Sequence, residues 1–200
     1  MRFFAIYKIC VKTSVSRAIA YRADFFLSLF VTFAGNLGLP LVALLIYSAG
    51  AQFPGWSFPE VLLIQSLYTL SQALVMVCLG DMLWVTMFHV REGSFETVLL
   101  KPMNPLTYLV STTFSTDAFG KLLCALALLC YALFQVQVAS LTAVLAGLLL
   151  FIGGVAVQAG SKLILAAVSF KWVGNSRLPE IFDSVESFGQ YPITIFPKAI

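Results

Sequence analysis

Charged residues are scarce in this sequence, and their scarcity excludes several classes of protein at once. Of the 200 residues, 10% are Asp, Glu, Lys or Arg, whereas 60% are hydrophobic and the mean hydropathy is +0.94. An average soluble domain is about a quarter charged, so this chain has too few polar side chains to cover a surface that faces water. We therefore predict an integral membrane protein. The small net charge of +3 argues against nucleic-acid binding.

Residues that carry catalysis or hold metals are also scarce. The single histidine, His89, argues against a histidine-based metal site. We interpret the four cysteines, which form no Cys-x-x-Cys pair, as small core residues: Cys10, Cys78, Cys124 and Cys130. No G-x-x-x-x-G-K-[ST] phosphate loop is present, so the chain is not expected to bind ATP by itself. No catalytic set stands out either, and we predict no enzyme activity, cofactor or metal in this chain.

Long apolar runs are what the sequence does have. The four runs 24–47, 61–90, 118–138 and 141–170 each reach or exceed the roughly 20 residues with which a helix crosses a hydrocarbon core of about 30 Å. Lipid offers no partner for backbone polar groups, so these runs are expected to be helices. Gly35, Gly38 and Pro40 predict a kink in the first run.

The segment 1–23, ahead of these runs, predicts a helix that lies in the membrane interface. Five apolar residues recur at helical spacing on one side: Phe4, Tyr7, Val11, Val15 and Ala18. The basic residues lie off that side, where they would meet anionic headgroups. A frayed basic tail is the alternative.

Basic residues alternate between the connectors and so predict the orientation. Five precede the first run (Arg2, Lys8, Lys12, Arg17 and Arg22), whereas the connector 49–60 has none. Arg91 and Lys101 follow the second run, the turn 137–140 has none, and Lys171 and Arg177 follow the fourth. Since Lys and Arg accumulate in cytoplasmic loops, we expect the N-terminus and the segment 91–106 to be cytoplasmic.

Four ionisable residues within or beside the runs predict a polar cluster inside the membrane: Asp81, Asp117, Lys121 and Lys162. Asp117 and Lys121 are four residues apart and are expected to pair on one helix face. Because a lone charge in the membrane is costly, we expect Asp81 to pair with Lys121 or Lys162. The alternative is that each lysine extends alone to the headgroups.

Three further patterns predict helix contacts or a path. Gln65, Thr69 and Gln72 form a polar stripe, which indicates either a substrate path or a helix–helix contact. Glycines in the fourth run indicate close helix approach: Gly147, Gly153, Gly154 and Gly160. Three carboxylates recur every three residues near the end, Glu180, Asp183 and Glu186. They are expected to face a partner subunit, a water-filled path or the interface.

The connector "REGSFETVLLKPMNPL", residues 91–106, predicts a short helix of its own. Ser94 is the expected N-cap, and Glu96 lies in the first turn. Phe95, Val98 and Leu99 would share one face, and Pro102 disfavours a longer helix. The pattern indicates about two turns of amphipathic helix along the membrane surface, with or without a partner.

Three stretches together resemble the membrane subunits of bacterial type-2 ABC exporters: "YRADFFLSLF", "REGSFETVLLKPMNPLTYL" and "YPITIFP". More narrowly, they resemble a poorly characterised branch related to drug and peptide efflux permeases. The R-x-G-x-x-x-x-x-L-L-K-P-x-N-P-L pattern is the most specific part.

This resemblance implies a single permease domain over 1–200, in a fold with an N-terminal interfacial helix and usually six membrane helices. The segment between the second and third helices would be the coupling helix, which docks on a separate ATPase subunit that binds ATP and Mg²⁺. That role falls on Arg91, Glu92, Gly93, Phe95, Glu96, Leu99, Lys101, Pro102 and Asn104. Two permease subunits, identical or related, would pair in the bacterial inner membrane and export a substrate along their interface.

The resemblance also implies that 178–200 is most of a fifth helix and that the sixth is missing, as in a truncated sequence. Two other classes of function stay open. One is a secondary transporter driven by an ion gradient, with Asp81 or the carboxylates of 180–186 as ion sites. The other is a membrane scaffold that transports nothing.

Overall fold

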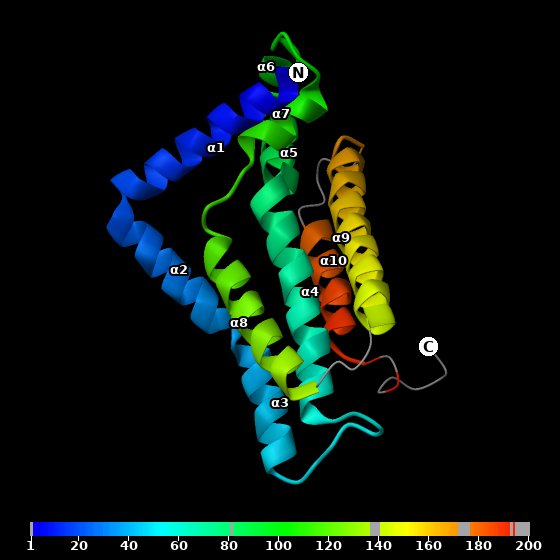
Figure 1. Cartoon of the computed structure of the whole chain (residues 1–200). Coiled ribbons are helices and arrows are strands. Elements are labelled where there is room, and N and C mark those ends of the chain that lie inside the picture. The colour runs from blue at the N-terminus through cyan, green and yellow to red at the C-terminus, as the bar shows by residue number, and fades with distance from the viewer. Residues whose placement is uncertain (1, 81, 137–140, 172–176, 193, 195–200) are drawn as a thin grey trace.

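The computed structural model describes residues 2–80, 82–136, 141–171, 177–192 and 194, and the regular structure within these residues is entirely helical (Figure 1). The elements are α1 (Arg2–Ala20), α2 (Arg22–Asn36), α3 (Gly38–Ser48), α4 (Phe58–Leu79), α5 (Met82–Arg91), α6 (Glu96–Leu99), α7 (Pro105–Thr112), α8 (Phe119–Val136), α9 (Leu141–Ser169), α10 (Leu178–Ser187) and the 3-10 turn η1 (Phe188–Gln190).

The prediction of an all-α membrane protein is confirmed. Among the described residues, four helical segments are long and apolar enough to cross a membrane: Arg22–Ser48, which comprises α2 and α3, and the helices α4, α8 and α9. The fifth helix expected over 178–200 is represented by α10, which has 10 residues and is not among these segments. Residues 193 and 195–200 lie outside the described part of the chain.

The predicted kink in the first run lies at Leu37, between α2 and α3. Pro40 falls in the first turn of α3, where a missing backbone N–H is tolerated. A sharper change of direction at Tyr21 separates α1 from α2 (Figure 1). The helix α1 contacts α7, and its Tyr7 ring meets Phe114 edge-on with centroids 6.3 Å apart.

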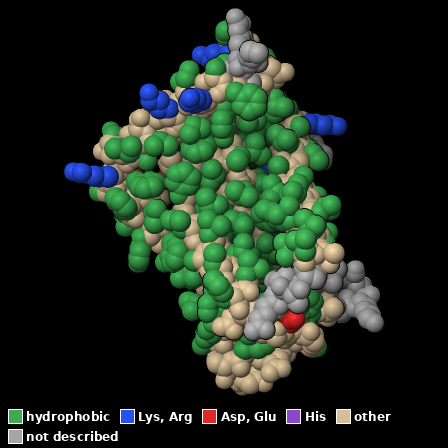
Figure 2. Space-filling model, in the orientation of Figure 1, with side chains coloured by type: hydrophobic (Ala, Val, Ile, Leu, Met, Phe, Trp, Pro, Cys, Tyr) green, Lys and Arg blue, Asp and Glu red, His purple; other side chains and the backbone are tan. Residues whose placement is uncertain are grey.

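The predicted interfacial segment is therefore a helix, and its basic side chains Lys8, Lys12 and Arg17 are exposed. In Figure 2, Lys and Arg side chains surround the end of the molecule that holds α1, whereas hydrophobic side chains cover most of the visible face below them. The location of α1 in a membrane interface stays a prediction.

The second run, expected to be one helix over 61–90, is broken. The helix α4 begins with a capping box of Ser57 and Glu60 and ends at Gly80, which has φ +46°. An added Cβ at Gly80 would overlap the backbone carbonyl of Thr113. Only glycine fits this close approach and this backbone conformation without strain, so the break lies where the α7–α8 connection crosses the second run.

The helices α2, α8 and α4 pack side by side, and α9 lies alongside α4 and α5 on the other side (Figure 1). The close contact between α2 and α8 depends on Gly120, where a Cβ would overlap the Thr32 Oγ1 and the Leu29 carbonyl. The predicted close approach at the α9 glycines is not made within the described residues, because a Cβ at each would meet nothing within 4 Å: Gly147, Gly153, Gly154 and Gly160.

Candidate functional site

The connector after α5 begins with a helix stop at Gly93. Gly93 has φ +66°, its N–H donates to the Val90 carbonyl (3.3 Å), and the Ser94 N–H donates to the His89 carbonyl (2.9 Å). These two bonds form the Schellman motif that commonly ends helices at a glycine. Gly93 therefore ends α5.

The predicted cap at Ser94 is wrong. The Ser94 hydroxyl is hydrogen-bonded to Nδ1 of His89 at 2.8 Å, and Phe95 occupies the N-cap position of α6 without a side-chain cap. The helix itself is a single turn of four residues, shorter than the two turns expected. Serine competes for such local partners because its hydroxyl both donates and accepts.

The helix α6 has one buried side chain and two outward-facing leucines. Val98 is 1% exposed and packs in a core cluster with residues of α5, α7 and α9. Phe95 is half-buried, with its ring edge-on to Phe170 and centroids 4.7 Å apart. Leu99 and Leu100 are 58% and 83% exposed. The expected common face of Phe95, Val98 and Leu99 is therefore wrong for Leu99.

The other predicted docking residues surround this turn. Four charged side chains are exposed: Arg91, Glu92, Glu96 and Lys101. Pro102 is also exposed, and Asn104 accepts from the Leu106 N–H at 2.9 Å to cap α7. The segment thus presents two leucines among exposed charges, on a turn held from beneath by Val98.

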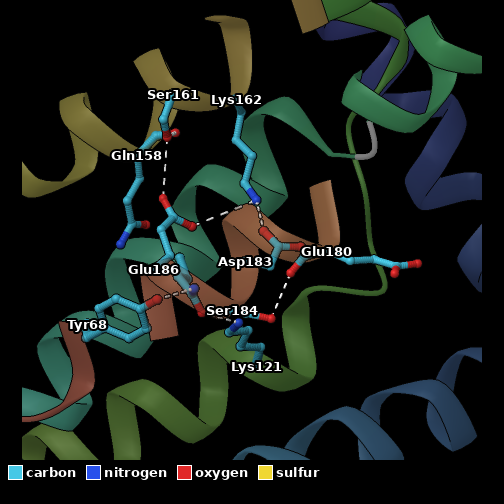
Figure 3. A network of polar contacts seen from close by, with 10 residues as sticks. Tyr68, Lys121, Gln158, Ser161, Lys162, Glu180, Asp183, Ser184 and Glu186 are labelled. Atoms are coloured by element: carbon cyan, nitrogen blue, oxygen red, sulfur yellow. Dashed lines mark hydrogen bonds and ion pairs between the residues drawn. The ribbon is translucent and has the colours of Figure 1, made fainter. Parts of the chain in front are cut away.

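A polar site, separate from the segment 91–105, lies between α4, α8, α9 and α10 (Figure 3). Lys162 of α9 donates to Oδ1 of Asp183 and lies 3.8 Å from Oε2 of Glu186, both on α10. The Ser161 hydroxyl donates to Oε1 of Glu186 at 3.4 Å. Glu180 is exposed and points away from Lys162 (Figure 3). Two of the three regularly spaced carboxylates thus bind α10 to α9.

Lys121 joins α8 to α4 at the same site. Its Nζ donates to Oε1 of Gln72 at 2.7 Å, and Nε2 of Gln72 donates to the Tyr68 hydroxyl at 2.7 Å. Asp117, the expected partner of Lys121, lies in the turn before α8 and is exposed. Within the described ranges no ion pair joins the two, because Asp117 precedes the first helical turn. Asp81, the other expected partner, lies outside the described residues.

The predicted polar stripe of α4 divides between two environments. Gln65 and Thr69 are 1% and 8% exposed, and the Thr69 hydroxyl donates to the Gln65 carbonyl at 2.8 Å. Neither side-chain amide atom of Gln65 has a hydrogen-bond partner among the described residues. Gln72, one turn further on, lines a cavity of about 380 Å³ together with Lys121, Gln158, Lys162, Asp183 and Glu186.

Comparison with known proteins decides the family. A family model described as ABC-2 family transporter protein matches residues 34–200. The chain belongs to the ABC-2 transporter family. Searches of curated proteins and of solved structures give no match. The family and the apolar helices together make the chain a multi-pass transmembrane component of an ABC transporter.

For this ABC-2 family protein, sequence reasoning missed the partners of Lys162 and the break at Gly80. The charges of Asp183 and Glu186 were a usable signal, since a lysine inside a membrane span requires a partner. The end of α9 and the segment 172–176 separate their helix from Lys162. Sequence spacing therefore could not predict which carboxylates would lie beside Lys162. Glycine is needed at position 80 because the Thr113 backbone packs against it, and Thr113 follows α5, α6 and α7 in the sequence.

Proposed function

We propose that this chain is the transmembrane subunit of an ABC exporter, and that a separate ATPase subunit binds the segment 91–105. ATP and Mg²⁺ would be held by that ATPase, and hydrolysis would take place there. The substrate is not assigned by this proposal. The observation that carries it is the arrangement of α6, in which Val98 is fixed in the core while Leu99 and Leu100 face outward.

This arrangement has the composition of a protein-binding surface. The centre of such an interface is apolar and its rim is polar. Leu99 and Leu100 would form the apolar centre, with Arg91, Glu96 and Lys101 in the rim. A docked ATPase would bury this leucine pair, which stands out from the exposed charged side chains around it.

The core beneath α6 supports a transmission role. Val98 packs in one cluster with Met82, Leu83 and Met87 of α5, with Leu109 of α7, and with Ala166 of α9. Close-packed interiors transmit displacement rather than absorb it. Movement of the ATPase against α6 would therefore shift α5 and α9 as a rigid unit, which is the two-state element that coupling to a distant ATP site requires.

The orientation and partners belong to the same proposal. We place the chain in the bacterial cytoplasmic membrane, with the N-terminus and α6 on the cytoplasmic side. Exposed basic residues at the α1 and α6 end of the molecule support this orientation (Figure 2). A second permease subunit, of the same or a related chain, would complete the transporter, and lipid would cover the exposed apolar side chains of α9.

Site-specific photo-cross-linking tests the proposal. A photo-reactive p-benzoylphenylalanine would be placed at Leu100, at Glu96 or, as the matched control, at the exposed Gln52 of the other connector. Irradiation of native membranes should give an adduct with a Walker-type ATPase from Leu100 and Glu96, and none from Gln52. An ATPase absent from all Leu100 and Glu96 adducts, in membranes with normal amounts of the chain, would refute docking at this segment.

The ion-gradient alternative has one supporting observation, the ionisable network of Lys162, Asp183 and Glu186 within the membrane-spanning bundle. Such groups also serve as ion sites in secondary transporters. Transport that stops when ATP is depleted at constant ion gradient supports the exporter. Transport that continues without ATP and stops when the gradient is collapsed supports the alternative.

A further inference from the structure

Two chemically different groups of side chains line the cavity between α4, α8, α9 and α10. One group is the charged and amide side chains described above (Figure 3). The other group is apolar and includes Leu79, Met82, Leu83 and Trp84. The cavity volume of about 380 Å³ is within the range of sites for small molecules, roughly 300–1,000 Å³. A ligand that fills it must therefore present both a polar end and an apolar body.

The helix break at Gly80, against which the Thr113 backbone packs, also lines this cavity. Gly80 lines the cavity and has a non-helical backbone between two halves of one apolar run. Irregular backbone at membrane depth is tolerated only where protein buries it or where it lines a water-containing cavity. Broken membrane helices accompany binding sites in transporters for this physical reason.

Among the described residues, one cation and one carboxylate of the cavity have capacity for a ligand. Lys121 donates to one neutral oxygen, that of Gln72, and no carboxylate lies within ion-pair distance of it among the described residues. Its ammonium has two further donors. Asp183 is 53% exposed and holds Lys162 through Oδ1, which leaves Oδ2 able to accept from another donor. Glu186 is 14% exposed and faces Lys162 and Ser161.

We propose that this cavity binds a zwitterionic amphiphile, with its anionic group at Lys121, its ammonium at Asp183 and its apolar body along α5. The inference rests on the proposed transport function and names its substrate class. Among the described residues that line the cavity, Lys121 and Lys162 balance Asp183 and Glu186, so a ligand with net charge would upset this balance. A zwitterion can contact both groups and preserves it.

A second cavity lies beside α5, nearer to α6. It has a volume of about 560 Å³, is lined by Trp84, Val85, Met87, Phe88 and Arg91, and shares Trp84 with the first. The two follow α5 from its last residue, Arg91, toward the Gly80 break. An amphiphile would move along the apolar face of α5 past Trp84, on the same helix that packs against α6.

Ligand titration of the isolated chain in a neutral maltoside detergent tests the site without any ATPase. Trp84 lines the cavity and serves as the reporter, in a background in which the other tryptophans are replaced, Trp56→Phe and Trp172→Phe. The zwitterionic probes are lysophosphatidylethanolamine, which has a phosphate, and a long-chain α-amino acid, which has a carboxylate. The probes with charge of one sign only are lysophosphatidic acid, which is anionic, and dodecylamine, which is cationic.

At least one zwitterion should change Trp84 emission saturably and bind roughly tenfold or more tightly than either the anionic or the cationic probe, the usual effect of one charge-assisted hydrogen bond. A preference for the phosphate probe identifies a lipid-type headgroup, and a preference for the carboxylate probe identifies an amino-acid-type ligand. Equal binding of lysophosphatidic acid or dodecylamine would overturn the proposal. This comparison of probes is made on a chain whose charged cavity residues are all unaltered.

Substitutions then assign the two charges. Lys121→Met should weaken the zwitterion roughly tenfold while leaving dodecylamine unchanged, and Asp183→Asn should weaken the zwitterion while leaving lysophosphatidic acid no weaker. Lys12→Met on the exposed side of α1 is the matched control and should change nothing. Unchanged zwitterion affinity in Lys121→Met contradicts the site. Cross-linking at Leu100 is unaffected by this result, so the site and the ATPase docking can fail separately.

Discussion

The two connectors at the ends of the second apolar run differ in what holds them. The connector 49–57 is held by hydrogen bonds and ring contacts. The Tyr47 hydroxyl donates to the Trp56 carbonyl at 2.8 Å, Nε1 of Trp56 donates to the Thr194 hydroxyl at 2.8 Å, and the Phe53 ring meets Tyr47 and Tyr191 edge-on. The connector 92–104 instead places Val98 into a core shared by three other helices. One connector is held by hydrogen bonds and half-buried rings, and the other by a side chain buried in the helical core.

This difference indicates where force can be transmitted. A displacement applied to the connector 49–57 meets Tyr47 of α3, Phe58 of α4, and Tyr191 and Thr194, none of which belongs to the core cluster around Val98. A displacement applied to α6 meets α5, α7 and α9 through Val98, and α5 leads to the Gly80 break and the cavity. Only the second connector combines exposed leucines with a buried anchor, and only the second carries basic residues.

The largest expected effect is that of Val98→Asp. A carboxylate at a position 1% exposed and surrounded by Met82, Met87 and Leu109 has no partner in that core, and burying it costs several kcal/mol. Thermal unfolding in detergent should show a large loss of stability. Phe53→Asp, at the half-buried ring of the other connector, should cost clearly less. Equal losses would remove the distinction between the connectors.

Phe95→Ala should have an intermediate effect. The ring is half-buried against Phe170, so its removal should lower the free energy of unfolding by about 1 to 3 kcal/mol. Because the ring fixes α6 to the end of α9, ATP hydrolysis in the assembled complex should become less dependent on substrate. Parallel assays of unfolding and of substrate-stimulated hydrolysis check this. Full stimulation in a destabilised variant would speak against a transmission role for Phe95.

Gly93→Ala and Gly55→Ala form a matched pair with the smallest expected loss. Both glycines have positive φ, +66° and +79°, and open space around an added Cβ. Each substitution should cost about 1 kcal/mol through backbone strain alone. Only Gly93→Ala changes the exit of α5 toward α6, so only this variant should reduce ATPase binding. Similar binding losses in both variants would show that the connectors are equivalent.

Much of the fold could be predicted from hydropathy, because a membrane imposes one length and one backbone solution on each apolar run. The break at Gly80 could not be predicted, because the need for glycine there comes from the nearby Thr113 carbonyl, which only the fold reveals. Helical spacing likewise placed Phe95 and Val98 on one face but overstated the length of α6. Because α6 is a single turn, Leu99 is directed outward with Leu100.

The candidate site was predicted in part. Lys121 and Lys162 were recognised as intramembrane charges that require partners, and they do lie at one site. Their partners are Gln72, Asp183 and Glu186, which the sequence analysis placed in separate patterns. The missing information was the position of α10 beside α9, which depends on tertiary packing and leaves no periodic signal in the sequence.

The most direct test of the central claim is whether the exposed leucines hold the ATPase. The complex would be purified through a tag on this chain carrying Leu100→Glu, with Gln52→Glu in the other connector as the matched control. Both positions are exposed, so neither variant should alter thermal unfolding. We expect the ATPase to be lost from the Leu100→Glu complex and retained with Gln52→Glu. An unchanged ratio of ATPase to permease in Leu100→Glu would contradict the account.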